Sequence, residues 1–499
     1  MGIIQKDALR TAIVSYIGML LGYVNKVLLF VILLSQEEVG LINLILALGL
    51  LFAQFANLGS INSTWKFFPY LKNPDNKHYG FLSLNVLITL GGVLIFALVY
   101  IIFNESIAAY FESRSSRFVD YYYWVIPVGV FVVLFKLLEN YLRALYKNVF
   151  AVIANDFIFR IVNTIILGLY AFKFFDFDVL LVLICLSQAI PALLLIGYLI
   201  YLKEWHINPK SISIPKKFQR IILVFSMYSY MNTLAANLVI SLDSIMIAGM
   251  IGLAELGAYG IVLYLIRALM IPYTSIMRVS SPIVAQHWKD RDMDKMSELY
   301  KRVSSVTLFI GLFLFLGTWV SIDEIFSLLP EEYAIGSSVF LLLMIGKIID
   351  IYMGLNGTIL VTSKKYKYDI LFTGSLILVV YVLNLAFIPE WGIDGAAIST
   401  TIAYFMYNLL RLYFVWKWYK IHPFKMSQAK VIVLFAVVLC LLLWIDLDFG
   451  NKWINMSVNS ALVVLGFPVV LYFTKIEPEI VQYVNKVLAV LKLKLGKKS

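Results

Sequence analysis

Long apolar runs, separated by short polar breaks, extend along the whole chain. Most of them are close to the roughly 20 residues that a helix needs to cross about 30 Å of hydrocarbon. None shows the short alternating strands that a membrane barrel would require. The pattern therefore predicts an all-α integral membrane protein with about 14 transmembrane helices. The predicted spans are 8–34, 39–60, 80–103, 119–141, 149–171, 179–202, 219–250, 256–281, 303–320, 336–361, 369–388, 394–416, 430–446 and 455–474.

Composition gives the same class of protein. Of the 499 residues, 61% are hydrophobic and 14% are charged, and the mean hydropathy is +0.87. These values exclude an ordinary water-soluble domain. The two cysteines, Cys185 and Cys440, both lie in apolar runs, so we expect neither a disulfide framework nor a metal site.

The distribution of basic residues predicts the topology. With an even number of spans both termini lie on one side, and the loops on that side carry 30 of the 41 Lys and Arg residues. The alternate loops carry Arg114, Arg117, Lys173 and Lys452. Because Lys and Arg concentrate in cytoplasmic loops, both termini are predicted to be cytoplasmic. The net charge of +11 is then a topology signal, and we expect no nucleic-acid partner.

Seven basic residues remain inside the predicted spans. Three lie near predicted cytoplasmic ends, where long side chains can extend to the headgroups: Lys136, Arg278 and Arg411. The other four lie deeper: Lys26, Arg160, Arg267 and Lys347. A deep cation either lines a water-filled cavity or belongs to a structural buried ion pair. The cavity is the favoured interpretation, and these four are the predicted substrate-binding cations.

Helical spacing supports a cavity. In the first span, small and polar residues share a stripe with Lys26, which therefore faces other helices and not lipid. A longer polar stripe follows almost the whole seventh span. Such a stripe fits the wall of an aqueous vestibule, although polar packing between helices remains the alternative. The predicted cavity-lining polar residues are Asn25, Tyr230, Asn237 and Tyr264.

Acidic residues in the spans qualify this interpretation. Asp156 precedes Arg160 by one turn and Asp350 follows Lys347 by three residues, so both cations have candidate partners on their own helices. Asp243 has no basic residue one turn away. We expect Asp243 and Asp350 to be candidate ion-coupling residues for Na⁺ or H⁺, with a structural role as the alternative for Asp243. No catalytic residue, metal ligand or cofactor is expected.

The chain also contains an internal repeat. "QEEVGLINLILAL" (36–48) matches "LAELGAYGIVLYL" (253–265), so that Gly40 and Gly257 are 217 residues apart. The offset predicts two six-helix halves in parallel pseudo-repeat, related by an axis along the membrane normal, followed by a C-terminal helix pair. The predicted parts are an N-terminal half (1–205), a cytoplasmic linker (206–218), a C-terminal half (219–420), a helix pair (421–474) and a basic amphipathic cytoplasmic tail (475–499).

Two segments carry a family resemblance. They are "LLSQEEVGLINLILALGLLFAQFANLGSINSTWKFFPYL" (33–71) and "SLDSIMIAGMIGLAELGAYGIVLYLIRALMIPYTSIM" (241–277). This pattern resembles the polysaccharide transport family, the Wzx-type flippases of the multidrug/oligosaccharidyl-lipid/polysaccharide (MOP) superfamily. The resemblance implies a bacterial inner-membrane transporter that moves an undecaprenyl-diphosphate-linked oligosaccharide of O-antigen, capsule or exopolysaccharide type to the outer leaflet.

The resemblance also suggests where the cargo binds. Related flippases have a cationic central cavity with basic residues on the first and eighth helices, where this chain has Lys26 and Arg267. The middle of the second span has no arginine, and its polar residues are Asn43, Gln54 and Asn57. Expected partners are the lipid-linked oligosaccharide, membrane lipids and, as a candidate, a glycan polymerase, and the predicted state is a monomer.

Two other functions remain open. One is an ion-coupled multidrug exporter of the same superfamily, which would be expected to have an anionic cavity for cationic drugs; four deep cations argue against it. The other is a membrane glycan polymerase or ligase. That enzyme class would need a substantial outer catalytic loop, whereas the predicted outer loops are short and all four histidines lie in predicted cytoplasmic loops. The enzyme is the weaker alternative.

Overall fold

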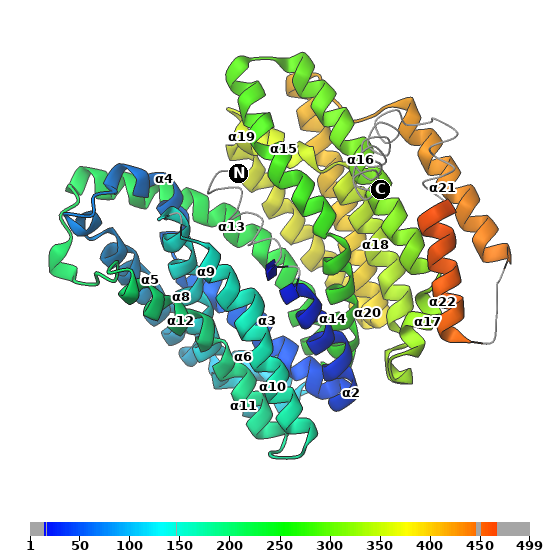
Figure 1. The fold of residues 1–499 in the computed structure, drawn as a ribbon, viewed down its shortest axis with the longest axis horizontal. Helices are drawn as coiled ribbons and strands as arrows, with labels where there is room; N and C mark the ends of the chain where they lie inside the picture. The colour runs from blue at the N-terminus through cyan, green and yellow to red at the C-terminus, as the bar shows by residue number, and fades with distance from the viewer. Residues whose placement is uncertain (1–13, 16, 146, 446–450, 467–499) are drawn as a thin grey trace, which may run out of the picture. The chain divides into compact units, whose positions relative to one another are not determined.

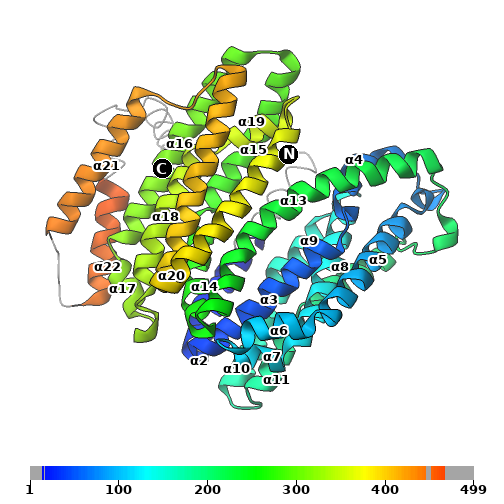
Figure 2. The ribbon, with the colours of Figure 1, turned by 180° about the vertical axis from the view of Figure 1, so that it is seen from behind.

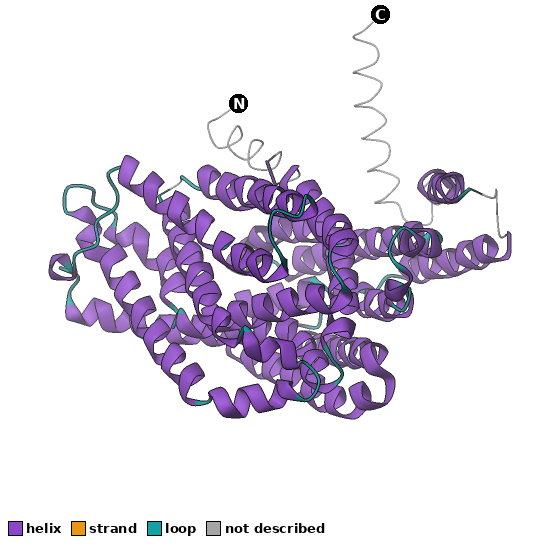
Figure 3. Cartoon of the chain, turned by 90° about the horizontal axis from the view of Figure 1, so that it is seen from below, coloured by secondary structure: helices purple, strands orange, loops and turns teal. Residues whose placement is uncertain are grey.

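The computed structural model describes residues 14–15, 17–145, 147–445 and 451–466, and within this part of the chain every regular element is a helix (Figure 3). The predicted tail (475–499) lies outside the described residues. The chain divides into two compact units, called unit 1 and unit 2 below. Unit 1 comprises Met1–Tyr264 with Asn384–Ile393, and unit 2 comprises Leu265–Leu383 with Asp394–Ser499.

Helices cover most of each predicted span in its described part, although several spans are interrupted by short turns. Among the described residues, eight helices are long and apolar enough to cross a membrane, or nine if one pair bent by 48° counts as one span. The multi-pass membrane class is therefore confirmed, whereas the count of 14 transmembrane helices is not. The predicted halves and their boundaries stay predictions.

Unit 1 is built mainly around α3, which packs against α8, α5 and α13 (Figure 1). Ser35 caps α3: its Oγ accepts from the Glu38 amide at 3.3 Å, and its own amide donates to the Glu38 carboxylate at 3.0 Å. The helices of unit 1 are α2 (Phe30–Leu33), α3 (Gln36–Ala56), α4 (Ser60–Leu71), α5 (Phe81–Ile102), α6 (Asn104–Glu112), α7 (Ser116–Asp120), α8 (Val125–Ala144), α9 (Val149–Val152), α10 (Phe159–Ala171), α11 (Phe177–Ser187), α12 (Ala189–Tyr201), α13 (Lys216–Met250) and the first part of α14 (Leu253–Leu269).

The second predicted span is broken, and its helix continues beyond the predicted end. α3 stops at Ala56, and Leu58 and Gly59 adopt φ values of 44° and 83° before α4 begins. Asn57 stabilises the break, because its Oδ1 accepts from the Gly59 amide at 2.7 Å. The apolar pattern does not reveal the break, since both helical segments are apolar on their packed faces.

The repeat-related glycines make a reciprocal contact in unit 1. A Cβ atom on Gly40 would lie 1.7 Å from the carbonyl oxygen of Leu253, and one on Gly257 would lie 2.2 Å from that of Gln36. Gln36 and Leu253 are themselves 217 residues apart, the offset that separates the glycines. A two-fold relation requires this kind of exchange, in which each repeat presents the same contact to the other. The parallel repeat of the two halves stays a prediction.

In unit 2, α16 packs against α18 and α15 (Figure 2). The 53-residue α20 covers two predicted spans and reverses direction at Gly392, where φ is 57° and ψ is −134°. Val431 of α21 joins an apolar cluster with Leu308, Leu312 and Leu316 of α16. The helices of unit 2 are the end of α14, α15 (Ile271–Asp290), α16 (Met293–Trp319), α17 (Ile322–Ser327), α18 (Gly336–Tyr352), α19 (Leu355–Thr362), α20 (Lys367–Tyr419) without its middle part, Asn384–Ile393, which belongs to unit 1, α21 (Met426–Ile445) and α22 (Lys452–Ala461).

Candidate functional site

Arg160 is the central side chain of a polar cluster in unit 1. Its Nη1 donates to the hydroxyl of Tyr264 at 2.9 Å. The guanidinium occupies the space left open by Gly22, where an added Cβ would lie 1.4 Å from Nη1. The Nε atom is buried without a hydrogen-bond partner, and Arg160 forms no ion pair with any described residue. A half-buried cation with a spare donor is suited to an anionic ligand.

Asn25 and Lys26 reach this cluster from a π-helical turn, Val24–Leu29. The Asn25 amide donates to the Arg160 carbonyl at 2.9 Å, and its Oδ1 accepts from Thr164 at 2.8 Å. The Lys26 ammonium donates to Asn43 Oδ1 at 3.3 Å and lies 4.2 Å from the centre of the Phe30 ring. We call these side chains the unit 1 cluster: Asn25, Lys26, Asn43, Arg160, Thr164 and Tyr264.

The structure thus brings together four of the predicted site residues: Asn25, Lys26, Arg160 and Tyr264. Sequence reasoning missed Thr164 and gave Asn43 no role. Asn43 was visible as a polar residue in the second span, but its contact with Lys26 joins two different helices. Thr164 follows Arg160 by one turn and donates to its carbonyl at 2.9 Å, so helical spacing could have identified it.

Asp156, the candidate partner on the same helix, forms no ion pair with Arg160. Its carboxylate accepts instead from Ser15 at 2.8 Å and from Asn155 at 2.9 Å. Asp156 lies in a second π-helical turn, Ile153–Ile158. Such a turn inserts one extra residue into the α-helical pattern, so residues four apart across it no longer lie above one another. The positive charge of Arg160 is therefore not neutralised from its own helix.

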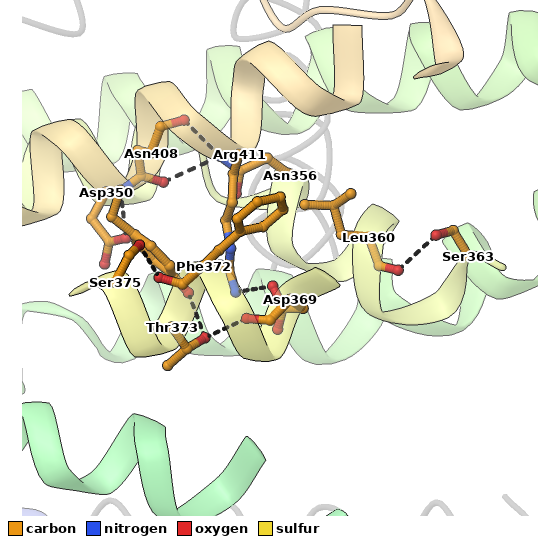
Figure 4. Close-up of polar contacts among 11 residues, drawn as sticks. Asp350, Asn356, Leu360, Ser363, Asp369, Phe372, Thr373, Ser375, Asn408 and Arg411 are labelled. Atoms are coloured by element: carbon orange, nitrogen blue, oxygen red, sulfur yellow. Dashed lines mark hydrogen bonds and ion pairs between the residues drawn. The ribbon is translucent and has the colours of Figure 1, made fainter. Parts of the chain in front are cut away.

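Lys347 in unit 2 behaves differently, because it has a carboxylate partner. Its ammonium lies 3.5 Å from the Asp350 carboxylate and 4.0 Å from the centre of the Tyr404 ring. The other oxygen of Asp350 accepts from Asn408 at 3.1 Å, and Asn408 in turn accepts from Asn356 at 3.2 Å (Figure 4). This connected arrangement fits the structural ion pair that the sequence left open for Lys347.

Arg411 does not extend to the headgroups as we expected from its depth. Its Nη2 lies 2.5 Å from the Asp369 carboxylate; the Asp369 side chain is buried, and the Arg411 side chain is 14% exposed (Figure 4). The guanidinium also packs 4.1 Å from the centre of the Tyr407 ring. Sequence position could not reveal this pair, because the two residues are 42 positions apart on the two arms of α20.

Removing one partner of the Arg411–Asp369 pair should destabilise the protein. We expect Asp369→Asn to cost about 3–5 kcal/mol, because it leaves a buried guanidinium without its counter-charge. Asp292→Asn is the matched control, since Asp292 pairs with Lys295 at an exposed site where such pairs contribute little. Thermal unfolding of the purified protein in detergent would measure both changes. Equal melting temperatures for Asp369→Asn and the wild type would contradict a stabilising pair.

The other predicted cations and polar residues differ in exposure and in hydrogen bonding. Arg267 is exposed on α14 and Arg278 is exposed on α15. The Tyr230 hydroxyl donates to the Phe55 carbonyl at 3.2 Å, next to the break between α3 and α4. Asn237 lies on α13, and its side chain is outside the described part of the structure. None of these residues is assigned to the unit 1 cluster.

Asp243 is buried in unit 1 and accepts hydrogen bonds from two neutral side chains. Its carboxylate accepts from the Tyr259 hydroxyl at 2.8 Å and from the Asn384 amide at 2.9 Å. The Asn384 amide nitrogen must face the carboxylate, because its oxygen would be repelled there. Asn384 Oδ1 is then left buried without a hydrogen-bond partner. An orphan oxygen beside a carboxylate is suited to a small cation.

The fold is that of a multi-pass membrane protein, and unit 1 holds a polar cluster with two half-buried cations. The chain belongs to the polysaccharide biosynthesis protein family, whose profile matches residues 4–288. This membership confirms the resemblance drawn from segments 33–71 and 241–277. The chain is similar to the capsular polysaccharide biosynthesis protein CapF of Staphylococcus aureus, with 23% identity over 207 residues, or 40% of this chain and 50% of CapF. The match thus spans half the length of that relative.

Solved structures show the same fold. The lipid II flippase MurJ in an inward closed conformation is 16% identical, with 94% of this chain and 99% of MurJ covered and a TM-score of 0.72. An inward-facing multidrug resistance MATE family transporter of the MOP superfamily is 12% identical, with 83% and 98% covered and a TM-score of 0.65. A MOP superfamily transporter from Pyrococcus furiosus is 14% identical, with 84% and 96% covered and a TM-score of 0.53.

Proposed function

We propose that this chain is an alternating-access flippase that moves an undecaprenyl-diphosphate-linked oligosaccharide across the bacterial inner membrane. The observation that carries the proposal is the Arg160 guanidinium, a cation inside a membrane helix that no described carboxylate neutralises. Holding such a charge in a membrane protein is costly unless water or an anion receives it. A diphosphate supplies that anion, and its polyprenyl tail can stay in lipid.

The neighbours of Arg160 suit this ligand. The Lys26 ammonium contributes a second positive charge in the same unit 1 cluster. Asn25, Asn43, Thr164 and Tyr264 supply amide and hydroxyl groups that can exchange their present hydrogen bonds for bonds to phosphate or sugar. Family membership and the MurJ-like fold support transport of a lipid-linked glycan over glycan polymerisation. Both termini are proposed to lie in the cytoplasm, with a monomer as the working state and a glycan polymerase as partner.

Export of the lipid-linked glycan tests the proposal. Cells that lack this chain should accumulate the glycan on the cytoplasmic leaflet, and expression of the wild-type chain should restore its appearance at the outer leaflet. The measurement is surface glycan, normalised to the amount of membrane-inserted protein. A multidrug exporter would instead restore resistance to cationic drugs and leave the glycan inside. That result would overturn the proposal. We do not expect it, because the positive charge of the unit 1 cluster disfavours a cationic drug.

Asp243 is the proposed coupling residue. Its carboxylate and the orphan oxygen of Asn384 can receive Na⁺, and the carboxylate alone can receive H⁺. Asp350 was the other candidate, but its carboxylate already faces Lys347. We therefore assign coupling to Asp243 and a structural role to Asp350.

Asp243→Asn should uncouple transport from the ion gradient. The substitution keeps the size of the side chain and removes its charge, so cation binding should be lost. We expect glycan transport in membrane vesicles to respond to an imposed Na⁺ or pH gradient for the wild type and to neither for Asp243→Asn. Asp178→Asn, at an exposed position, is the control and should respond like the wild type. An unchanged gradient response in Asp243→Asn would exclude this role.

A further inference from the structure

Five exposed lysines gather where the two arms of α20 meet in unit 2. The start and end of this helix are brought together, because the rings of Tyr368 and Trp418 lie 5.0 Å apart. None of the five lysines forms an ion pair within the described residues. They are Lys364, Lys365, Lys367, Lys417 and Lys420. This concentration of unpaired positive charge is not explained by the cargo site.

Aromatic rings hold several of these ammonium groups in place. The Lys365 ammonium lies 5.6 Å from the centre of the Trp418 ring and 5.7 Å from that of Tyr368. Lys420 lies 5.0 Å from Trp416 in the same way, and Lys417 lies 5.6 Å from the Tyr413 ring. A ring face attracts an ammonium without cancelling its charge. We call the five lysines with Tyr368, Tyr413, Trp416 and Trp418 the lysine–aromatic patch.

The acidic residue nearest in sequence does not neutralise the patch. Asp369 directly follows Tyr368, but its carboxylate is buried and paired with Arg411. Asp369 is the acidic residue next in sequence to Lys364, Lys365 and Lys367, and its negative charge is compensated by Arg411. The lysine charges therefore remain available to an anion from outside the protein.

The face of α20 that leads to the patch is suited to lipid. Phe405, Leu409, Tyr413 and Trp416 lie within about 80° of one another around the helix, at 100° per residue. Their exposed fractions are 46%, 42%, 50% and 49%. Lys420 continues the same face. An apolar stripe that ends in tryptophan and then lysine is the pattern of a helix passing from hydrocarbon to headgroups.

We propose that the lysine–aromatic patch binds the phosphate headgroup of an anionic phospholipid. The lysines supply positive charge, the rings lie at headgroup level, and the apolar stripe accommodates the acyl chains beside α20. A soluble anion would need no apolar stripe, which is why a membrane lipid is the occupant. The site shares no residue with the unit 1 cluster, and the proposal does not depend on the identity of the cargo.

The test measures binding of individual lipids to the full-length protein. The purified chain is titrated in detergent with phosphatidylglycerol or phosphatidylcholine, and bound lipids are counted by native mass spectrometry. The variant combines Lys365→Gln, Lys417→Gln and Lys420→Gln. Each lysine near a membrane surface contributes roughly fivefold to anionic lipid affinity, so we expect the phosphatidylglycerol Kd to rise on the order of 100-fold. Binding of phosphatidylcholine should not change.

A matched control removes the same charge elsewhere. It combines Lys210→Gln, Lys216→Gln and Lys217→Gln, three residues of the predicted linker (206–218) for which the described part of the structure shows no ring contact. This control should keep the wild-type phosphatidylglycerol Kd. An equal loss in both triple variants would show a general effect of net charge and overturn the proposal. Equal wild-type affinity for the two lipids, or unchanged phosphatidylglycerol binding in the patch variant, would overturn it as well.

Discussion

Arg160→Ala should reduce glycan export by roughly 10- to 100-fold per inserted molecule, the range expected for loss of a charge-assisted hydrogen bond to phosphate. The amount of the variant protein in the membrane should stay near that of the wild type. Arg160 pairs with no described carboxylate, so the substitution leaves no buried carboxylate without a counter-charge. Arg160→Lys should retain part of the activity, since it keeps the charge but loses the planar guanidinium fork.

Lys347→Ala is the informative contrast. It removes a cation of similar depth but leaves the Asp350 carboxylate without its partner. We expect the amount of inserted protein to fall, while export per remaining molecule stays close to normal. Surface glycan and membrane-inserted protein are measured together for both variants. Wild-type export per molecule in Arg160→Ala would refute the cationic site and leave this arginine a structural role.

The two cations differ in a way that sequence alone could not resolve. Arg160 and Lys347 were both identified as candidate cargo-binding cations by their depth in an apolar run. Each also has an acidic residue within one turn in the sequence. The outcome depends on local helix geometry. A π-helical turn separates Asp156 from Arg160, whereas Lys347 and Asp350 share the regular helix α18. A single inserted residue in the backbone leaves no mark on the hydrophobic pattern, so the difference in pairing was not predictable.

Helical spacing was most informative where a residue's position on one face of a single helix determines its contacts. It placed Asn25 and Lys26 on the side of the first span that faces other helices, and both side chains contact them. The repeat offset likewise identified Gly40 and Gly257, which the structure places in a reciprocal contact. The contact between Arg411 and Asp369 could be predicted only from the way α20 folds back on itself. The pattern showed two spans there and could not show which side chains meet.

Gly22→Ala should mimic Arg160→Ala without removing any charge. A methyl group at this position would lie 1.4 Å from Arg160 Nη1 and 2.6 Å from the Tyr264 hydroxyl, so the guanidinium must leave its place. The protein should still fold, because the end of a flexible side chain can move and alanine favours a helix over glycine by up to about 1 kcal/mol. We expect normal insertion and a loss of export that approaches the loss in Arg160→Ala.

The control for this substitution is Gly168→Ala on α10, where an added Cβ meets no atom within 4 Å. It makes the same chemical change in a helix interior and should leave export unaltered. The double variant Gly22→Ala/Arg160→Ala then shows how the two positions are related. If glycine at position 22 serves to seat the guanidinium, the double variant should export no less than Arg160→Ala alone, because the two changes remove the same interaction. Additive losses would show that Gly22 acts through close packing of the first helix and not through Arg160.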